Sequence, residues 1–526
     1  MKYYFLTLIL PIVLFTVGCG SADSVEDTAT YITPDATAYI DTNTSLGHVI
    51  SMDANITNNT FHYSWRVLEE PFGSNVSIEN NSSAHATFKP IYGGIYSFLL
   101  VVSNANNELA INQLDIYVDG KSHQQYSSED GNYFAYANAV DEKGISYIAS
   151  LINYAPHHPT QGSHDIVVTK IDANGTQAWT TTYGTNDQDI VNAISIDAAH
   201  NVYVSGNTNA AFDGFTNLGD HDIFISKLSS SGQNLWTKQL GSIDDTNATY
   251  IVQNDEAIAM VSDDDGTTYL LSEGQGRLGA NTYYGGYDIY VTKISTNGDI
   301  IWTKQYGSTS DDHAGDIVKD SNGNIYVSAQ TSASFMGETK LGASDIVLMK
   351  LSGSGTLIWS KQFGTDFYDY TKALSIDKND SIYIAGVSSG TFENQTKIGF
   401  QDGYLIKFDT DGVQQWKQHF GTPESVEVSD MAIDNHSNIV ITGYTEGSFL
   451  NAPNAGEEDA YLITYDSTGK KLDATLFGTL KSESAQSIAI DTQGTRYITG
   501  YTNGNFINNT VTNRYDFFLT KIANKQ

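Results

Sequence analysis

The chain has 526 residues, a formal net charge of −34, 46 glycines, 33 tyrosines and only 8 prolines. A chain this acidic repels nucleic acid and anionic membrane surfaces, so we predict no polyanionic partner. Its length suits several ordinary domains or one large repeat array. The abundance of Gly and Tyr, with only 17% charged residues, is typical of many short strands joined by tight turns.

The N-terminal segment "MKYYFLTLILPIVLFTVGC" has the features of an export signal. Lys2 precedes an apolar run from Tyr3 to Val17, which is short for a membrane span. The run ends at Gly18 and Cys19, the single cysteine of the chain. This arrangement resembles the bacterial lipoprotein signal, in which a small residue precedes a lipidated cysteine. It departs from that pattern at Thr16, where the family prefers Leu.

The resemblance implies a lipoprotein signal peptide over residues 1–18 and a lipid on Cys19, with a flexible tether over residues 19–35. Gly20 follows the cysteine in place of Asp, which favours the outer membrane or cell surface over retention at the inner membrane. A plain signal peptide and an uncleaved anchor are the alternatives. The lipid would be the only contact with a membrane.

Residues 36–120 alternate apolar and polar residues in short runs such as "HYSWRV" and "YSFLLVVSN". About seven short strands separated by Gly, Asn and Ser clusters predict an immunoglobulin-like β-sandwich. The segments around Tyr63-Ser64-Trp65, "ATFKP" and Gly94-Ile95-Tyr96 resemble the PKD family. That resemblance implies a spacer or binding module with Trp65 in the core. We expect Trp65 and Tyr96 to be core residues.

Residues 121–526 repeat one unit seven times. The seven copies are separated by six spacings, five of 57 residues and one that is nine residues longer, which predicts a repeat architecture. One recurring anchor is an Asp that begins an apolar run: Asp165, Asp222, Asp288, Asp345, Asp402, Asp459 and Asp516. A second is a Trp fourteen residues later: Trp179, Trp236, Trp302, Trp359 and Trp416. A third is an Asp six residues before a Tyr or Val: Asp141, Asp197, Asp263, Asp320, Asp377, Asp434 and Asp491.

Each unit contains four strand signals, which in the fifth unit are "KALSID", "SIYIAGV", "DGYLIKFD" and "VQQWKQHFG". Four antiparallel strands repeated seven times predict an all-β fold, a seven-bladed β-propeller, in which the Trp and Tyr anchors pack between blades. The chain stops after the third strand of the last unit. We therefore predict that the missing fourth strand comes from the N-terminal side, near His123.

These units resemble the SBBP β-propeller repeat family over residues 121–526. The shared pattern is an Asp-led strand ending in Lys, a Gly turn, the Trp anchor and an aromatic-Gly pair, followed by Asp-x-x-Gly-Asn-x-Tyr. The resemblance implies a propeller on exported and cell-surface proteins, and it implies a location more than an activity.

The loops between the fourth strand of one unit and the first strand of the next all carry a carboxylate. Five residues after the loop glycine stand Asp189, Asp312, Asp369 and Glu483, with Thr246 and Val426 in the other copies. We expect these residues near the mouth of the channel, where they could bind a cation or sugar hydroxyls. The alternative is that each carboxylate caps its own loop, and recurrence at the blade period favours it. The nine-residue surplus between Trp236 and Asp263 makes that loop the least symmetric.

Other candidate sites are weaker. The turns "DDDG" at 263–266 and "DTDG" at 409–412 lack the later Gly and Glu of a calcium loop. His157, His158 and His164 share a loop, but adjacent histidines point apart. We predict no metal site and no cofactor, with calcium dependence left open. The recurring loop phenylalanines should fold inward: Phe212, Phe335, Phe392, Phe449 and Phe506.

Together these features predict an exported, lipid-anchored surface protein with a non-catalytic binding or adhesion function. Its ligand, a polysaccharide or a cell-surface protein, would dock on the acidic loop face of the propeller. A carbohydrate-active enzyme that uses two loop carboxylates is one alternative. A structural scaffold of an envelope assembly is the other.

Overall fold

The computed structural model describes residues 34–40, 49–55, 60–69, 76–90, 94–118, 121–127, 131–154, 162–243, 253–449, 454–505 and 514–523. Every element named within these ranges is a β-strand, so the all-β prediction is confirmed. Within the same ranges, no helix has the length and apolar character needed to cross a membrane. The predicted signal peptide and Cys19 lie outside the described residues.

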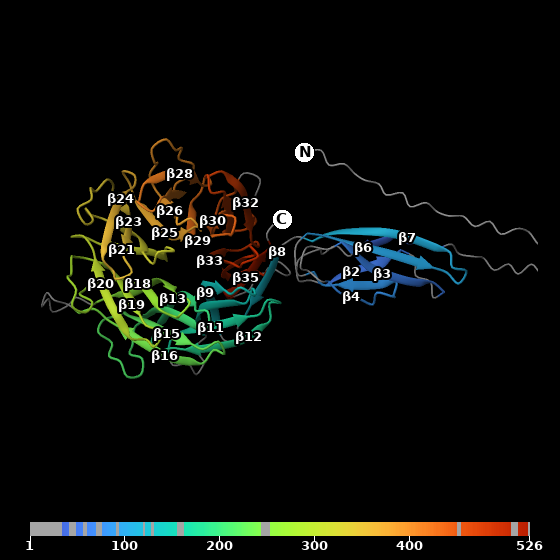
Figure 1. The fold of residues 1–526 in the computed structure, drawn as a ribbon, viewed down its shortest axis with the longest axis horizontal. Coiled ribbons are helices and arrows are strands. Elements are labelled where there is room, and N and C mark those ends of the chain that lie inside the picture. Colours follow the sequence, from blue (N-terminus) through green and yellow to red (C-terminus); the bar gives the residue numbers. More distant parts are fainter. Residues whose placement is uncertain are drawn as a thin grey trace, which may run out of the picture.

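Two sheets form the N-terminal part of the chain and share one core. One sheet has the order β1-β2-β5-β4 and the other β3-β6-β7. Their strands are β1 (Ala38–Ile40), β2 (Ile50–Ala54), β3 (His62–Glu69), β4 (Ile78–Glu79), β5 (His85–Phe88), β6 (Gly94–Ser103) and β7 (Leu109–Val118). Trp65 and Tyr96 are buried between the sheets, as predicted, and Trp65 Nε1 donates to the Ser83 carbonyl at 3.0 Å. Figure 1 shows this sandwich beside a much larger ring.

The ring consists of four-stranded antiparallel sheets. The first three are β9 (Gly131–Val140), β10 (Ser146–Tyr154), β11 (His164–Ile171), β12 (Gln177–Tyr183); β13 (Asp189–Ile196), β14 (Val202–Thr208), β15 (Asp222–Leu228), β16 (Asn234–Leu240); and β17 (Asp255–Ser262), β18 (Thr268–Gly274), β19 (Asp288–Ile294), β20 (Ile300–Tyr306). The next two are β21 (Asp312–Lys319), β22 (Ile325–Thr331), β23 (Asp345–Leu351), β24 (Leu357–Phe363); and β25 (Asp369–Ile376), β26 (Ile382–Ser388), β27 (Asp402–Phe408), β28 (Gln414–Phe420).

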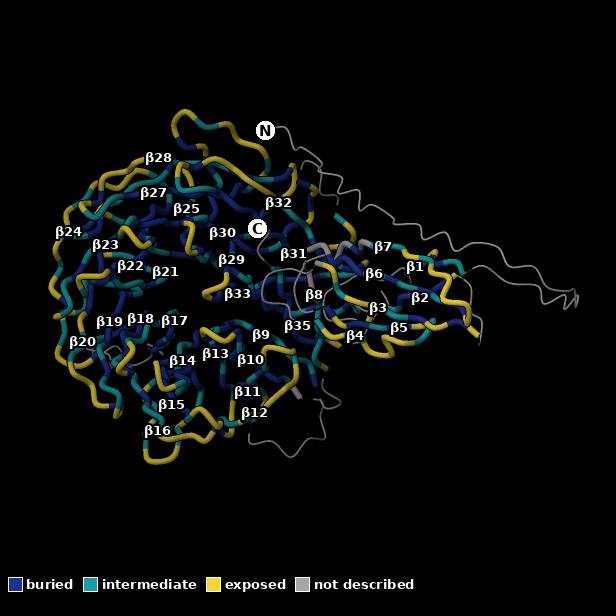
Figure 2. The backbone as a smooth tube through the Cα atoms, turned by 45° about the vertical axis from the view of Figure 1, so that its right-hand side comes forward, coloured by how far each residue is buried: buried dark blue, intermediate teal, exposed yellow. Residues whose placement is uncertain are grey.

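Two more sheets complete the ring. They are β29 (Val426–Ile433), β30 (Ile439–Thr445), β31 (Asp459–Tyr465), β32 (Lys471–Phe477); and β33 (Glu483–Ile490), β34 (Arg496–Thr502), β35 (Asp516–Ile522), β8 (Lys121–Tyr126). The first strand of each sheet contacts the first strand of the next, and β33 contacts β9. This cyclic order closes a ring with the first strands innermost, which is the arrangement of a β-propeller (Figures 1 and 2).

The ring is closed by a strand from the N-terminal side, as predicted. β8 pairs with β35, and His123 lies opposite Thr520. Ser122 takes the place that Trp holds in most fourth strands, since it pairs with Lys521. Gln125 Nε2 donates to Asp516 at 2.7 Å. Because β8 covers the free edge of β35, the two ends of the ring are joined by main-chain hydrogen bonds.

The Trp and Tyr anchors link neighbouring sheets, which confirms the prediction of inter-blade packing. Trp416 Nε1 donates to the carbonyl of Ser467 in the next sheet at 3.2 Å. Tyr383 belongs to one buried cluster with Ile441 and Tyr461 of the next sheet. Within its own sheet, the Lys407 ammonium lies 5.0 Å from the centre of the Tyr383 ring. Gly412 sits against the preceding sheet's Trp359, where an added Cβ would lie 3.0 Å from the indole. The repeated anchors thus hold one sheet to the next.

The loop phenylalanines also occupy the predicted interior positions. Phe335, Phe392 and Phe449 are buried, and Phe212 packs partly buried against the core of the first two sheets. The fifth, Phe506, lies outside the described residues. These rings attach the long loops between second and third strands to the sheets.

Candidate functional site

The four carboxylates predicted from the loops begin the innermost strands, all at one end of the ring. Asp189, Asp312, Asp369 and Glu483 are the first residues of β13, β21, β25 and β33. Each has no exposed surface. A side chain with no exposed surface does not touch a ligand on the rim, so their placement favours the loop-cap alternative.

Their hydrogen bonds show what these carboxylates do. Asp369 accepts the Thr365 backbone N–H at 2.6 Å and the Ser388 hydroxyl at 2.5 Å. Asp189, Asp312 and Glu483 likewise accept the backbone N–H of the residue four positions earlier. Each carboxylate therefore holds the turn that enters its own strand.

The prediction of Thr246 as the equivalent residue in the third sheet was wrong. Asp255 begins β17, is fully buried and accepts the Ser242 backbone N–H at 2.6 Å. The count from Gly241 failed because the nine surplus residues lie between that glycine and the cap. Val426 holds the same place in the sixth sheet. Because its side chain is apolar, the sixth sheet has no carboxylate cap at this position.

Burial changes the ionisation of these carboxylates. It raises the pKa of Asp189 and Asp312 to about 6 and that of Asp255 to about 7. Asp288 is a buried cap of the third strand β19, since it accepts the Tyr284 backbone N–H at 2.8 Å, and burial raises its pKa to about 7 as well. The charge of a nearby carboxylate also raises the pKa of Asp189, Asp255 and Asp288. The hydrogen bonds that these carboxylates accept lower their pKa and so oppose the shift. The protonation of these groups therefore changes close to neutral pH, so the stability of the fold should depend on pH.

The residue after each cap varies from sheet to sheet, and Glu is the one residue type that occurs twice. We call these seven residues the inner rim: Phe134, Ile190, Glu256, His313, Tyr370, Glu427 and Ser484. Successive residues of a strand point to opposite faces, so a buried cap is followed by a residue on the other face. All except Ser484 are partly exposed. The inner rim therefore combines a repeated backbone with side chains that vary among the sheets.

One junction of the inner rim holds an acid–base pair. His313 Nδ1 lies 2.9 Å from Glu273 Oε1, and the Ala314 backbone N–H donates to Glu273 Oε2 at 2.7 Å. The Glu273 side chain is almost buried, whereas 37% of the His313 side chain is exposed. The hydrogen bond with Glu273 is the largest cause of a raised His313 pKa, followed by the opposing cost of burial. Glu273 thus fixes the orientation of the imidazole.

Further polar and aromatic groups surround this pair. The Tyr287 ring centre lies 5.0 Å from that of His313, at an interplanar angle of 38°. Glu256 is within 4.0 Å of His221 Nδ1. Burial, followed by the charge of Glu273, raises the pKa of Glu256. Two histidines and two glutamates from adjacent sheets thus meet beside an aromatic ring.

Aromatic side chains extend this surface over the next sheet. Tyr368 and Tyr370 stack with their ring centres 6.2 Å apart and their planes 5° from parallel. Phe367 and Tyr368 are 58% and 52% exposed, and Phe400, in the loop before β27, is 77% exposed. Solvent-exposed rings of this kind offer flat apolar faces to a ligand.

The sequence analysis missed the inner rim because it looked for residues that recur. His313 and Tyr370 stand directly after the recurring Asp312 and Asp369, at a position that varies among the repeats. The signal that would have found them is variation at a fixed place in an otherwise regular repeat. The prediction that the lengthened third unit breaks the symmetry concerns the same sheet, since Glu256 and Glu273 belong to it.

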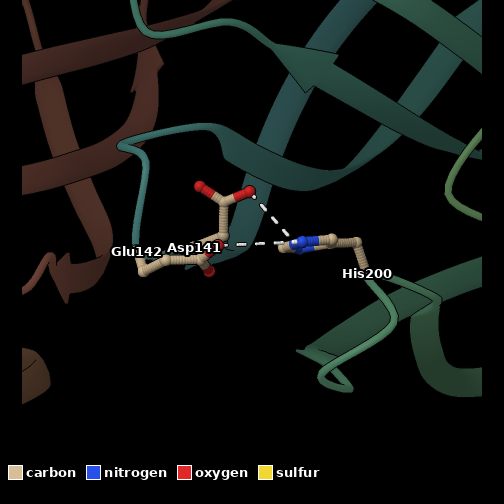
Figure 3. A group of neighbouring side chains, drawn as sticks. All are labelled: Asp141, Glu142 and His200. Carbon is tan, nitrogen blue, oxygen red and sulfur yellow. Dashed lines mark ion pairs between the residues drawn. The ribbon is translucent and has the colours of Figure 1, made fainter.

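At the opposite end of the strands, Asp141, Glu142 and His200 form the one group of three metal-ligand types found among the described residues (Figure 3). His200 Nδ1 lies 3.4 Å from Asp141, and Nε2 lies 3.9 Å from Glu142. His200 holds the same turn position as Asp380, which binds Ser321 of the preceding sheet. The contact of His200 with Asp141 and Glu142 therefore corresponds to the Asp380–Ser321 contact, which joins the turns of two neighbouring sheets.

Among the described residues, the predicted histidine cluster and the calcium turns contribute to no group of three metal-ligand side chains. His157 and His158 lie outside the described residues, and His164 begins β11. Gly266 and Gly412 have φ of 83° and 75°, as hairpin turns require.

Comparison with known proteins identifies the repeat. The profile of the SBBP family, described as a beta-propeller repeat, matches residues 301–335 and 358–393. An uncharacterized WD repeat-containing protein of Acanthamoeba polyphaga mimivirus is 21% identical over 209 residues, which are 32% of this chain and 15% of that protein. The regulatory protein FlaEY of Caulobacter vibrioides is 23% identical over 205 residues, 35% of this chain and 21% of that protein. The match thus spans a small part of each relative.

Several solved propellers are also similar. The β-propeller domain of the Trilobed protease from Pyrococcus furiosus is 12% identical, with a TM-score of 0.39 over 75% of this chain and 96% of that one. A polysaccharide lyase, Uly1, is 10% identical, with a TM-score of 0.42 over 76% and 99%. Identities and TM-scores this low carry no argument about activity. The ring is a β-propeller, and residues 301–335 and 358–393 of it carry the SBBP repeat.

Proposed function

We propose that this protein is an exported, lipid-anchored surface protein that binds a polysaccharide without catalysing its cleavage. In this proposal, Cys19 carries the lipid, the sandwich is a PKD-like spacer, and the ring is a seven-bladed propeller displayed away from the membrane. The polysaccharide docks at the inner rim.

The observation that supports this function best is the exposed aromatic surface beside the inner rim. Phe367 and Tyr368 directly precede β25, Tyr370 lies in β25, and Phe400 precedes β27 of the same sheet. The rings of Tyr368 and Tyr370 are nearly parallel. The axial C–H groups of a pyranose ring pack on such faces, while neighbouring carboxylates accept hydrogen bonds from sugar hydroxyls. A row of separated rings suits a polymer, because successive sugar units can each occupy one.

The placement of the loop carboxylates supports a non-catalytic role. Glycoside hydrolysis needs two accessible carboxyl groups on either side of the scissile bond. The four candidate carboxylates, Asp189, Asp312, Asp369 and Glu483, have no exposed surface and hold loop amides. The proposal includes no cofactor, and calcium is the ion to test.

A glycan-array screen of the full-length protein in detergent tests the proposal, with calcium and with chelator. We expect binding that Tyr368→Ala and Phe400→Ala weaken. Ile301→Ala is the matched control, because Ile301 is an exposed apolar residue on the outer strand β20. Binding equally reduced by all three variants would contradict a rim site. No binding in either condition would replace the polysaccharide with a protein partner.

A further inference from the structure

The inner rim places the Glu273–His313 pair at a junction where the fold itself requires no such pair. Each junction joins a rim residue to the second strand of the preceding sheet. The equivalent register positions of the six other junctions hold Leu151 and Ile190, Asn207 and Glu256, Gln330 and Tyr370, Val387 and Glu427, Tyr444 and Ser484, and Tyr501 and Phe134. Tyr501 and Phe134 pack with ring centres 5.1 Å apart. Sheets of one design thus carry a different pair of residues at every junction.

The geometry of the pair leaves one ring nitrogen for other contacts. Both oxygens of Glu273 are occupied, by His313 Nδ1 and by the Ala314 amide. His313 Nε2 is the nitrogen that this arrangement does not use. With the imidazole held by Glu273 on one side and against the Tyr287 ring, Nε2 has a fixed direction. A fixed donor or acceptor beside an aromatic face is what recognition of a sugar hydroxyl needs.

The charges around His313 are mostly negative. The titratable groups near it are the carboxyls of Glu256, Glu273, Asp311 and Asp312, the His221 imidazole and the Tyr287 hydroxyl. Asp312 is fully buried and Glu273 almost buried, so Glu256 and Asp311 are the carboxyl groups of this set that are accessible to a ligand. Their negative charge favours neutral sugars over sugars with carboxylate or sulfate groups.

We propose that the inner rim around His313 and Tyr287 is a subsite for uncharged sugar units, in which His313 contacts the ligand through Nε2 and Glu256 and Asp311 exclude anionic sugars. The proposal rests on the polysaccharide function above and names its substrate class. Tyr287 stacks on the sugar, and Glu273 positions His313. The polymer continues from this subsite over the Tyr368 and Tyr370 rings of the next sheet.

Calorimetric titration of the full-length protein with matched probes tests the subsite. The uncharged probes are cellohexaose, mannohexaose, xylohexaose and fully methyl-esterified polygalacturonate, and the anionic probe is polygalacturonate itself. We expect at least one uncharged probe to bind and polygalacturonate not to bind. Glu256→Gln combined with Asp311→Asn should raise the affinity for polygalacturonate. Equal binding of polygalacturonate and its methyl ester by the parent protein overturns the selection.

Two single variants separate a ligand contact from a structural role. His313→Asn should weaken binding of the uncharged probe at least about ten-fold. His436→Asn, an exposed histidine in a turn at the other end of the strands, should leave it unchanged. Glu273→Gln should keep the fold and move the midpoint of the pH–affinity curve to lower pH, because it removes the main group that favours protonated His313. Melting temperatures within one or two degrees of the parent verify folding.

The outcomes distinguish the two proposals. If no glycan binds to the parent protein, the polysaccharide function and this subsite both fail. If a glycan binds and His313→Asn and His436→Asn have the same affinity, the subsite fails while the function stands. An unchanged pH–affinity curve in Glu273→Gln overturns the role given to the pair.

Discussion

Asp312 and His313 are neighbours in the chain but differ in burial and in role, and the same is true of Asp369 and Tyr370. The first residue of each pair recurs in most sheets, is fully buried and holds a loop amide. The second varies from sheet to sheet, with only Glu found twice, and is partly exposed in every sheet except the last. In a repeat protein, a residue that recurs once per unit stabilises the unit, because every unit has to adopt the same fold. A specific ligand meets the ring at one place, so its contacts lie at positions that vary.

The comparison separates two kinds of acidic residue that look alike in the sequence. Asp255 and Glu256 follow one another, yet Asp255 caps β17 while Glu256 belongs to the inner rim. The net charge of −34 therefore has a structural part and an exposed part. The following changes act on one part at a time, in order of decreasing expected effect.

Removal of the closing strand tests the repeated part most severely. A chain that begins at Ser127 lacks β8 and leaves the edge of β35 unpaired, whereas a chain that begins at Gly120 keeps it. We expect the shorter chain to lose its cooperative thermal transition and to aggregate, because the ring is open and a strand edge is exposed. Calorimetry of the two chains measures the difference. Equal transitions would show that the ring is stable without closure.

Asp369→Ala and Tyr370→Ala compare the two parts at adjacent residues. Asp369→Ala leaves the Thr365 amide and the Ser388 hydroxyl without their acceptor, which should cost about 3 kcal/mol of unfolding free energy. Tyr370→Ala should cost about 1 kcal/mol or less and weaken glycan binding. Chemical denaturation and titration check both. A larger loss of unfolding free energy in Tyr370→Ala than in Asp369→Ala would contradict the distinction between structural caps and rim residues.

The sequence predicted the part of the fold that repeats and little of the part that varies. The strand order, the inter-sheet role of Trp416 and Tyr383 and the closure near His123 all follow from the period, because identical units must pack identically. Gln125 could have strengthened the closure prediction, since it bonds Asp516 as Gln239 bonds Asp222. The Glu273–His313 pair could not be predicted, because it joins residues forty positions apart in two sheets and occurs once.

Stability should fall as the pH rises from about 4 to about 7. In the folded protein, burial raises the pKa of Asp255 and Asp288 to about 7, whereas an unfolded Asp titrates near pH 4. The folded state thus binds more protons in this window, so a stability contribution present at low pH is lost on the way to neutral pH. We expect a higher melting temperature at pH 5 than at pH 8.

Two variants assign this pH dependence to the buried caps. Asp288→Asn should reduce the difference in melting temperature between pH 5 and pH 8, because it removes one buried titrating group. Asp265→Asn is the control, since Asp265 is exposed and its hydrogen bonds with Thr267 lower its pKa. A higher melting temperature at pH 8 in the parent protein would contradict the burial argument.

Trp416→Phe is the mildest test of the repeated part. The variant keeps an aromatic ring against Gly469 of the next sheet but removes the indole N–H that donates to the Ser467 carbonyl. We expect a loss of about 1 kcal/mol of unfolding free energy and no change in glycan affinity. The sixth unit has Asp473 in this place. Asp473→Trp should therefore raise the unfolding free energy if the site has room for an indole ring. Should Trp416→Phe alter glycan binding without altering stability, the Trp anchors would belong to the ligand surface and the division between recurring and varying positions would fail.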